Sequence, residues 1–188
     1  SRKMIYFIDN FISSDNLNKL NAYLNNFQEV DTGEKKFWVM DVPQNILEIF
    51  CNKIQLIEGN KPEVLLSMFR ISDSKRDVDW RIHCDGIINN DIPNRAAIFY
   101  ISESSYNQLH GTAFWQHKKY GEFLNNDKLE NFNKLILEDA NNLDVWNLKS
   151  VIGYKQNRLL SYPANYFHSK YPNKSWENGR KILVIFYK

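Results

Sequence analysis

The sequence has few of the features that disulfide-held, metal-ribbon or membrane-spanning proteins need. Its 188 residues include only two cysteines, Cys51 and Cys84, and no CxxC pair, which argues against a disulfide framework, a zinc ribbon and a redox motif. Two reduced thiols are typical of a cytoplasmic protein, and that is the location we expect. No apolar run approaches the roughly 18 residues that cross a bilayer, so we expect no membrane partner. Asp9 and Asn10 break the first apolar stretch too early for a signal peptide.

Net charge is also small, at a formal +2, which argues against a protein whose main work is coating nucleic acid or an anionic membrane. A nucleic-acid substrate stays open. The hydrophobic fraction of 43% is ordinary for a globular protein and is enough for a sizeable core. We expect a single domain over residues 1–188. Aromatic residues are abundant, with 12 Phe, 10 Tyr and 5 Trp, and large rings suit sheet faces and walled pockets.

Residues 1–60 have the pattern of an N-terminal support made of strand, helix, strand and helix. The apolar segment 4–8 predicts a short strand, and Ser13 or Ser14 can cap a helix after it. A second strand is expected at 37–40. Pro43 can open a second helix, which Gly59 would end.

Residues 61–188 predict a mainly β region with flanking helices. About eight short segments rich in β-branched, aliphatic and aromatic residues alternate with turn-forming residues. They are 64–71, 78–84, 96–101, 112–116, 145–154, 159–162, 166–168 and 182–187. The polar stretch 118–142 contains a further helix, which could form a lid or belong to the scaffold. This pattern is typical of an antiparallel sandwich or jelly-roll core with helices packed outside.

The chain has four histidines, and the first of them is followed two residues later by a carboxylate, in His83-Cys84-Asp85. On a strand, residues i and i+2 project from the same face, so His83 and Asp85 can point into one cavity while Cys84 points away. One more histidine from a distant strand would complete a set of two His and one carboxylate. That set leaves open positions on Fe(II), as oxygen chemistry requires. Taken alone, the motif is equally compatible with an ordinary turn.

The C-terminal segment strengthens the iron hypothesis. His168 follows the run Asn157-Arg158-Leu159-Leu160-Ser161-Tyr162-Pro163, and Arg180 opens the last apolar strand. The arginine side chain matches a carboxylate through its fixed fork of donors. An arginine at the mouth of an apolar strand is costly unless it is paired. An HxD motif, a downstream histidine and such an arginine are much harder to obtain together by chance.

With these residues the sequence resembles the 2-oxoglutarate- and Fe(II)-dependent oxygenases, and in particular their prolyl-4-hydroxylase-like branch with its small phage and bacterial members. The segments NRLLSYPANYFH and HGTAFWQH echo strands of that family. The resemblance implies a double-stranded β-helix core and His83, Asp85 and His168 as the Fe(II) ligands. It also implies that Arg180 binds the far carboxylate of 2-oxoglutarate. Tyr100 matches a family tyrosine that binds the same carboxylate, although a core aromatic residue explains it equally well.

The activity implied by the resemblance is hydroxylation of an unactivated C–H bond with O2, in a peptidyl residue such as proline or in a small metabolite. 2-Oxoglutarate would be converted to succinate and CO2. Halogenating members replace the carboxylate ligand with a small residue, so Asp85 favours hydroxylation, or demethylation through a hydroxymethyl group.

Three alternatives stay open. The nucleobase-demethylating branch usually has a second arginine in the terminal strand, and none follows Arg180 here, so we rank nucleic acid below a peptide or metabolite. A cupin-type jelly roll that uses no 2-oxoglutarate would have no need of Arg180. A non-catalytic jelly-roll binding module would more often have lost one of the three ligands.

The sequence departs from the family pattern at two places. Many members have a tyrosine in the strand before HxD, where this chain has Phe69 and Arg70, so the contacts to the 1-carboxylate of 2-oxoglutarate are not assigned. His110 replaces a family glycine, and we expect His110 and His117 at solvated loop or strand-end positions rather than at the metal. The candidate pocket or rim residues are Trp80, Arg81, Trp115, Tyr120 and Trp176. The sequence assigns neither a specific substrate nor an oligomeric state.

Overall fold

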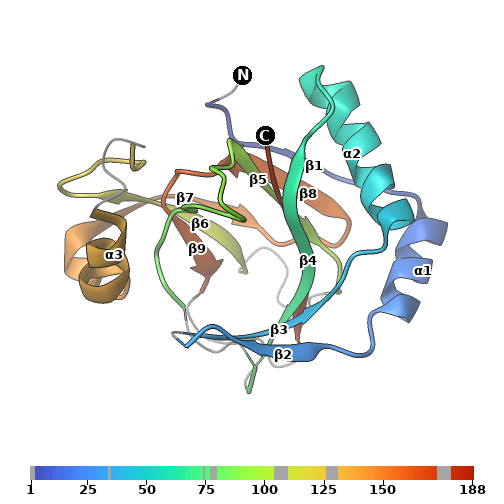
Figure 1. Cartoon of the computed structure of the whole chain (residues 1–188), viewed down its shortest axis with the longest axis horizontal. Helices are drawn as coiled ribbons and strands as arrows, with labels where there is room; N and C mark the ends of the chain where they lie inside the picture. Colours follow the sequence, from blue (N-terminus) through green and yellow to red (C-terminus); the bar gives the residue numbers. More distant parts are fainter. Residues whose placement is uncertain are drawn as a thin grey trace.

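Two antiparallel sheets form the centre of the protein, and two helices cover the outer side of the larger one (Figure 1). The computed structural model describes residues 3–33, 35–73, 75–76, 80–103, 110–125, 131–172 and 179–188. Within this part of the chain, no helix has both the length and the apolar character that crossing a membrane would require.

The N-terminal region contains β1 (Tyr6–Ile8), α1 (Ser14–Tyr23), β2 (Gln28–Asp31), β3 (Lys36–Met40) and α2 (Gln44–Glu58). Helix α1 begins after Ser13, whose side-chain oxygen accepts a hydrogen bond of 3.1 Å from the Asn16 amide. Pro43 precedes α2, and Gly59 ends it in the left-handed region at φ 87°, where glycine carries no Cβ penalty. These boundaries confirm the expected order, and β2 is an addition to it.

The remaining strands are β4 (Val64–Ser72), β5 (Arg95–Tyr100), β6 (Gly111–His117), β7 (Trp146–Gly153), β8 (Arg158–Pro163), β9 (His168–Tyr171) and β10 (Arg180–Tyr187). The larger sheet has the order β1-β8-β5-β10-β4-β3-β2, and the smaller one β7-β6-β9. From β5 to β10 the chain therefore passes repeatedly between the two sheets. This winding is the double-stranded β-helix, or jelly roll, and it confirms the predicted fold class.

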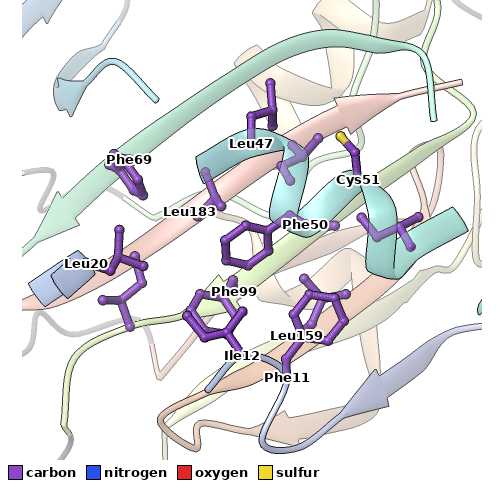
Figure 2. Close-up of a cluster of buried hydrophobic side chains, with 14 of the residues drawn as sticks. Phe11, Ile12, Leu20, Leu47, Phe50, Cys51, Phe69, Phe99, Leu159 and Leu183 are labelled. Atoms are coloured by element: carbon purple, nitrogen blue, oxygen red, sulfur yellow. The ribbon is translucent and has the colours of Figure 1, made fainter. Parts of the chain in front are cut away.

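The larger sheet has two different faces because successive side chains on a strand alternate between its sides. On the outer face Phe69, Phe99 and Leu183 pack with Phe50 of α2 in a continuous apolar cluster (Figure 2). Phe50 and Phe99 meet edge to face with ring centroids 4.9 Å apart. Each such buried side chain contributes about 1.5–3 kcal/mol to stability. The inner face, turned toward the smaller sheet, carries the aromatic and charged residues described below.

Two segments differ from the expectation. Residues 80–84 do not form a regular strand, because the amides of Ile82, His83 and Asp85 bond to three separate segments and only His83 makes a β-bridge. Residues 77–79 of the predicted strand lie outside the described residues. Segment 118–142 contains, in place of one regular helix, the short helix α3 (Phe132–Lys134) followed by a π-helical turn at Leu135–Asp139. Residues 126–130 also lie outside the described residues.

Candidate metal centre and co-substrate pocket

His83 and His168 face each other across a two-bond β-bridge. The His83 amide donates to the His168 carbonyl at 3.0 Å, and the His168 amide donates to the His83 carbonyl at 2.8 Å. Their ring centroids are 4.4 Å apart. The Asp85 amide bonds to the carbonyl of Ala164 at 2.8 Å, which ties the HxD segment to the turn before β9. Backbone pairing thus brings together residues from distant parts of the sequence.

The three side chains converge on one point. His83 Nε2 lies 4.0 Å from Asp85 Oδ1, and His168 Nε2 lies 3.8 Å from Asp85 Oδ2. One potential ligand atom from each residue lies within 4.8 Å of the other two. This is the two-His, one-carboxylate set that suits Fe(II) with open coordination positions.

Hydrogen bonds on the far side of each imidazole fix which nitrogen is available. His83 Nδ1 lies 2.8 Å from the carbonyl oxygen of Arg81, and His168 Nδ1 lies 2.7 Å from that of Tyr166. Because a carbonyl only accepts, each Nδ1 carries the proton and each Nε2 keeps its lone pair for a metal. The backbone therefore orients both rings so that Nε2 is the nitrogen available to a metal ion.

The carboxyl group of Asp85 lies between the two imidazoles. Oδ2 of Asp85 is buried and has no hydrogen-bond donor among the described residues. Burial raises the pKa of Asp85, and the nearby His168 and Arg70 oppose that rise. The pKa of His83 lies well below its usual value, first through desolvation by tightly packed neighbours and then through His168, although 37% of its side-chain surface remains open. A buried carboxylate without a full set of donors is costly by itself, and with two imidazole nitrogens beside it the group fits a divalent cation.

The residue between His83 and Asp85 points elsewhere, as expected. Cys84 lies in a separate apolar cluster with Ile82 and Trp146. Desolvation, followed by the charge of Asp85, raises the pKa of its thiol to about 12. Cys84 is therefore a packed thiol rather than a metal ligand, and Cys51 is also free and buried.

Arg180 and Tyr100 meet on the inner face of the larger sheet. Arg180 begins β10, is 4% exposed, and has its guanidinium carbon 5.7 Å from the centroid of the Tyr100 ring. The Tyr100 hydroxyl shares a hydrogen bond of 2.6 Å with Thr112 Oγ1, and its ring stacks on Tyr154 at 4.3 Å. Burial raises the pKa of Tyr100, and the Arg180 cation opposes that rise. A buried cation beside an oriented hydroxyl can bind a carboxylate.

Tyr162 of β8 also lies on the inner face of the larger sheet, and it was not predicted from the sequence as a site residue. Its ring centroid is 4.7 Å from that of His168. Burial raises its pKa well above the ordinary value, Asp85 and Tyr100 add to the rise, and Arg180 opposes it. The available signal was alternation on β8, where Leu160 and Tyr162 share one face. Tyr162 thus packs beside His168 on the inner face of the larger sheet.

Solved structures with this architecture include 2-oxoglutarate- and Fe(II)-dependent oxygenases. HygX from Streptomyces hygroscopicus, solved with nickel, 2-oxoglutarate and hygromycin B, matches 99% of this chain and 83% of its own at a TM-score of 0.61 and 13% identity. The chain has the fold of the 2-oxoglutarate- and Fe(II)-dependent oxygenases. The prolyl hydroxylases within that fold also match, which confirms the predicted resemblance at the level of structure. No protein-family model and no curated protein sequence matches the chain.

Two of these prolyl hydroxylases cover nearly the whole chain. The viral collagen prolyl hydroxylase vCPH of Paramecium bursaria Chlorella virus-1, solved with 2-oxoglutarate, covers 98% of this chain and 96% of its own at a TM-score of 0.54 and 12% identity. A prolyl-4-hydroxylase of Pseudomonas putida covers 98% and 91% at a TM-score of 0.56 and 11% identity.

The two remaining histidines, His117 and His110, lie in different surroundings. His117 ends β6, so the expected strand-end position is confirmed, but it is 4% exposed and the expected solvation was wrong. Its Nε2 lies 2.8 Å from Asp139 Oδ2, and its Nδ1 accepts a hydrogen bond from the Lys119 amide at 3.0 Å. It therefore ties the π-helical turn to the smaller sheet. His110 is partly buried just before β6, and its pKa is lowered first by desolvation and then by Arg180.

The candidate rim residues belong mostly to packing. Trp80, Trp115 and Tyr120 are partly buried against the apolar cluster that contains Cys84. Trp176 lies outside the described residues, and Arg81 contributes its backbone carbonyl to His83. A cavity of about 920 Å³ lies elsewhere in the oxygenase fold, between β1, the end of α2 and the start of β5. None of the three convergent metal-site residues lines it.

Proposed function

We propose that the protein is an Fe(II)- and 2-oxoglutarate-dependent dioxygenase acting as one domain over residues 1–188. It hydroxylates an unactivated C–H bond in a peptidyl residue or a small metabolite and releases succinate and CO2. One observation carries the proposal: two imidazoles, each with Nδ1 bonded to a backbone carbonyl and Nε2 directed at a buried carboxyl group whose Oδ2 has no donor among the described residues. The match to HygX, which was solved with nickel and 2-oxoglutarate, supports the same cofactors here.

Each residue has a role that follows from its surroundings. His83, Asp85 and His168 hold Fe(II), and the single carboxylate leaves the ion with a net positive charge that favours an anionic co-substrate. Bound Fe(II), 2-oxoglutarate and O2 supply the oxidising chemistry. Arg180 and the Tyr100 hydroxyl bind the far carboxylate of 2-oxoglutarate, and Thr112 orients that hydroxyl. Asp85 occupies a position that chloride needs in halogenation, which favours hydroxylation.

The substrate class is a peptide or a small molecule. The prolyl hydroxylases among the similar structures support a peptidyl substrate, and HygX, solved with hygromycin B, supports a small molecule. The near-neutral net charge of +2 ranks nucleic acid below both. Two free, buried cysteines support a cytoplasmic location.

The decisive experiment is anaerobic addition of Fe(II) and 2-oxoglutarate to the full chain, followed by visible spectroscopy. We expect the charge-transfer band of the chelate in the wild type and its loss in His83→Ala and in Asp85→Ala. His110→Ala removes an imidazole outside the proposed ligand set and is expected to keep the band. A wild type without the band, or a band unchanged in Asp85→Ala, contradicts the proposal.

The role of Arg180 is tested separately. Arg180→Ala is expected to weaken 2-oxoglutarate binding while Fe(II) binding by equilibrium dialysis is retained. Lys181→Ala is the matched control, because Lys181 points to the opposite side, where its Nζ donates to the Leu24 carbonyl at 3.4 Å. Normal 2-oxoglutarate affinity in Arg180→Ala would show that another residue binds the far carboxylate.

A further inference from the structure

The cavity of about 920 Å³ lies where α2 ends against the larger sheet, and none of the three metal-site residues lines it. Its volume is within the range of about 300–1,000 Å³ that small-molecule sites have. Its walls come from distant parts of the chain: β1 and the residues before it, the end of α2, the start of β5, the turn after β8 and the end of β10. We name it the α2-end cavity.

A carboxylate in the wall of the α2-end cavity is held in one orientation. Glu58, the last residue of α2, lines the cavity, and its Oε2 accepts hydrogen bonds from the hydroxyl groups of Tyr6 and Tyr187, the second at 2.6 Å. Burial, followed by the hydrogen bond to Glu58, raises the pKa of Tyr6 to about 12, and burial raises the pKa of Tyr187 as well. Both phenols therefore keep their protons and donate to Oε2.

The other oxygen of the same carboxylate is left for a ligand. Oε1 of Glu58 receives no hydrogen bond from the part of the chain that the structure describes, and 23% of the side-chain surface of Glu58 is exposed. A carboxylate oxygen has two acceptor positions. A hydrogen bond to an ionised acceptor is roughly twice as strong as one between neutral groups. Oε1 is therefore the acceptor that the cavity offers.

The charges around the cavity favour a neutral ligand. Two of its three lining cations already have a carboxylate beside them: Arg95 Nε lies 3.8 Å from Glu58 Oε2, and Lys188 Nζ lies 2.8 Å from Asp91 Oδ1. The third, Lys3, is exposed. A cationic ligand at Oε1 would meet Arg95 beside the carboxylate, and an anionic ligand would be repelled by the carboxylate itself. A neutral hydroxyl group can donate to Oε1 without adding a charge.

The remaining side chains of the cavity suit a molecule with several hydroxyl groups. The rings of Phe123 and Tyr166 stack with centroids 5.8 Å apart and planes 16° apart, and they offer apolar surface to C–H groups. Side-chain amides both donate and accept hydrogen bonds, as hydroxyl groups do. The amides that line the cavity are those of Asn60, Asn94, Asn125 and Asn165.

The backbone of the cavity wall is already paired, which disfavours an extended peptide that would add to the wall as a strand. The Asn94 amide donates to the Tyr187 carbonyl at 3.0 Å, and the Asn94 carbonyl accepts from the Ala164 amide at 3.0 Å. Glu63 and Lys188 exchange two backbone hydrogen bonds of 2.9 Å. Recognition in the cavity therefore falls to side chains.

We propose that the α2-end cavity binds a neutral saccharide, with a sugar hydroxyl donating to Glu58 Oε1 and the C–H groups of the sugar ring against Phe123 and Tyr166. The site is separate from the candidate metal centre, so the inference does not rest on the proposed function.

The test uses the full chain without metal and with a chelator present. The probes are the methyl glycosides of glucose and of galactose, each with its 2-amino and its uronic acid counterpart, and a blocked hexaproline peptide. Binding is measured by NMR titration of the probe signals. We expect the neutral member of at least one set to bind about tenfold or more tightly than its charged counterparts, because like charges side by side repel each other.

Substitutions then assign the binding to the cavity. Glu58→Gln keeps the size of the side chain and removes its charge, so the neutral glycoside should bind about 10–100-fold more weakly, the value of one hydrogen bond to a charged group. Glu48→Gln removes an exposed carboxylate of the same helix that does not line the cavity, and it should leave the affinity unchanged.

A second variant tests the site without touching its carboxylate. Asn60→Trp fills the cavity from an exposed position and should abolish binding, and it remains informative if Glu58→Gln does not fold. Asn52→Trp, at an exposed position of α2 that does not line the cavity, is its control and should bind normally.

Three results would overturn the inference: no neutral glycoside of the panel binding, tighter binding of the charged counterparts, or full affinity in Glu58→Gln or Asn60→Trp. Binding of hexaproline in place of the glycosides would also overturn it, because it would identify the cavity as a peptide site.

Discussion

The two faces of the larger sheet use the same strands for different purposes. On β10, Leu183 and Ile185 turn to the helices, whereas Arg180, Ile182 and Val184 turn to the interior. The outer face is mainly apolar, with Arg95 and Ser161 as buried polar residues near the end of α2, whereas the inner face combines aromatic rings with the buried Arg180. Alternation along each strand thus allows one sheet to supply both a stabilising core and a chemical site.

Substitutions on the two faces should therefore change different properties of the protein. Outer-face substitutions remove buried area and leave a cavity, so they should affect stability first. Inner-face substitutions near Asp85 remove a group that is costly to bury, so they should affect ligand binding first.

The largest expected effect is on the outer face, in Phe99→Ala. Phe99 is fully buried at 0% exposure and contacts Phe11 and Phe50. We expect the free energy of unfolding to fall by about 3–5 kcal/mol in urea denaturation. Val30→Ala, at an exposed position on β2, is the control and should change it little. A loss below about 1 kcal/mol for Phe99→Ala would show that the outer face does not carry the core.

Asp85→Ala should show the opposite pattern. In metal-free protein, with a chelator present, we expect the free energy of unfolding to stay unchanged or to rise by as much as about 1–3 kcal/mol, because an uncompensated buried group is removed. The same substitution abolishes metal binding. Urea denaturation and dialysis against Fe(II) measure the two effects. A marked loss of metal-free stability would mean that Asp85 has a structural role instead.

A smaller effect, on 2-oxoglutarate binding, should distinguish the stacked residues Tyr100 and Tyr154 on the inner face. Tyr100→Phe should weaken 2-oxoglutarate binding by roughly tenfold, the value of about one hydrogen bond to a charged group. Tyr154→Phe is the matched control, because its hydroxyl donates to the Ser102 carbonyl at 2.7 Å. Titration of the visible band gives both affinities. Equal affinities in the two variants would identify Tyr100 as a core aromatic residue only.

The smallest expected change concerns the thiols. With a pKa of about 12, Cys84 has on the order of one thiolate in 10⁴ at pH 8, so iodoacetamide should leave it unmodified in the native protein. Desolvation raises the pKa of Cys51 as well. Mass spectrometry should find alkylation of both only after denaturation. Rapid native labelling of Cys84 would show that the cluster around Ile82 opens readily.

Much of this arrangement was predictable because it depends on local patterns. The relation of His83 to Asp85 needs only two-residue spacing, and the ends of α2 follow from Pro43 and Gly59. The jelly roll was predicted from short β-rich segments and from the resemblance that also supplied His168 and Arg180.

The remaining features depend on tertiary partners. All four residues of β2 are exposed, and Val30 is the one apolar residue among them. The strand therefore has no alternation of apolar and polar residues by which it could be predicted. His117 is buried because Asp139 happens to lie beside it, and the inward direction of Tyr162 and Arg70 is fixed by strand register. None of these partners is near in sequence.

The bridge between His83 and His168 has a consequence for how the site is filled and emptied. The spacing of the two imidazoles is set by paired backbone amides, and each ring is oriented by a carbonyl of its own segment. Loss of the ion would therefore not require the chain to unravel. The Fe(II) ion proposed for this site could therefore leave and return without a new round of folding.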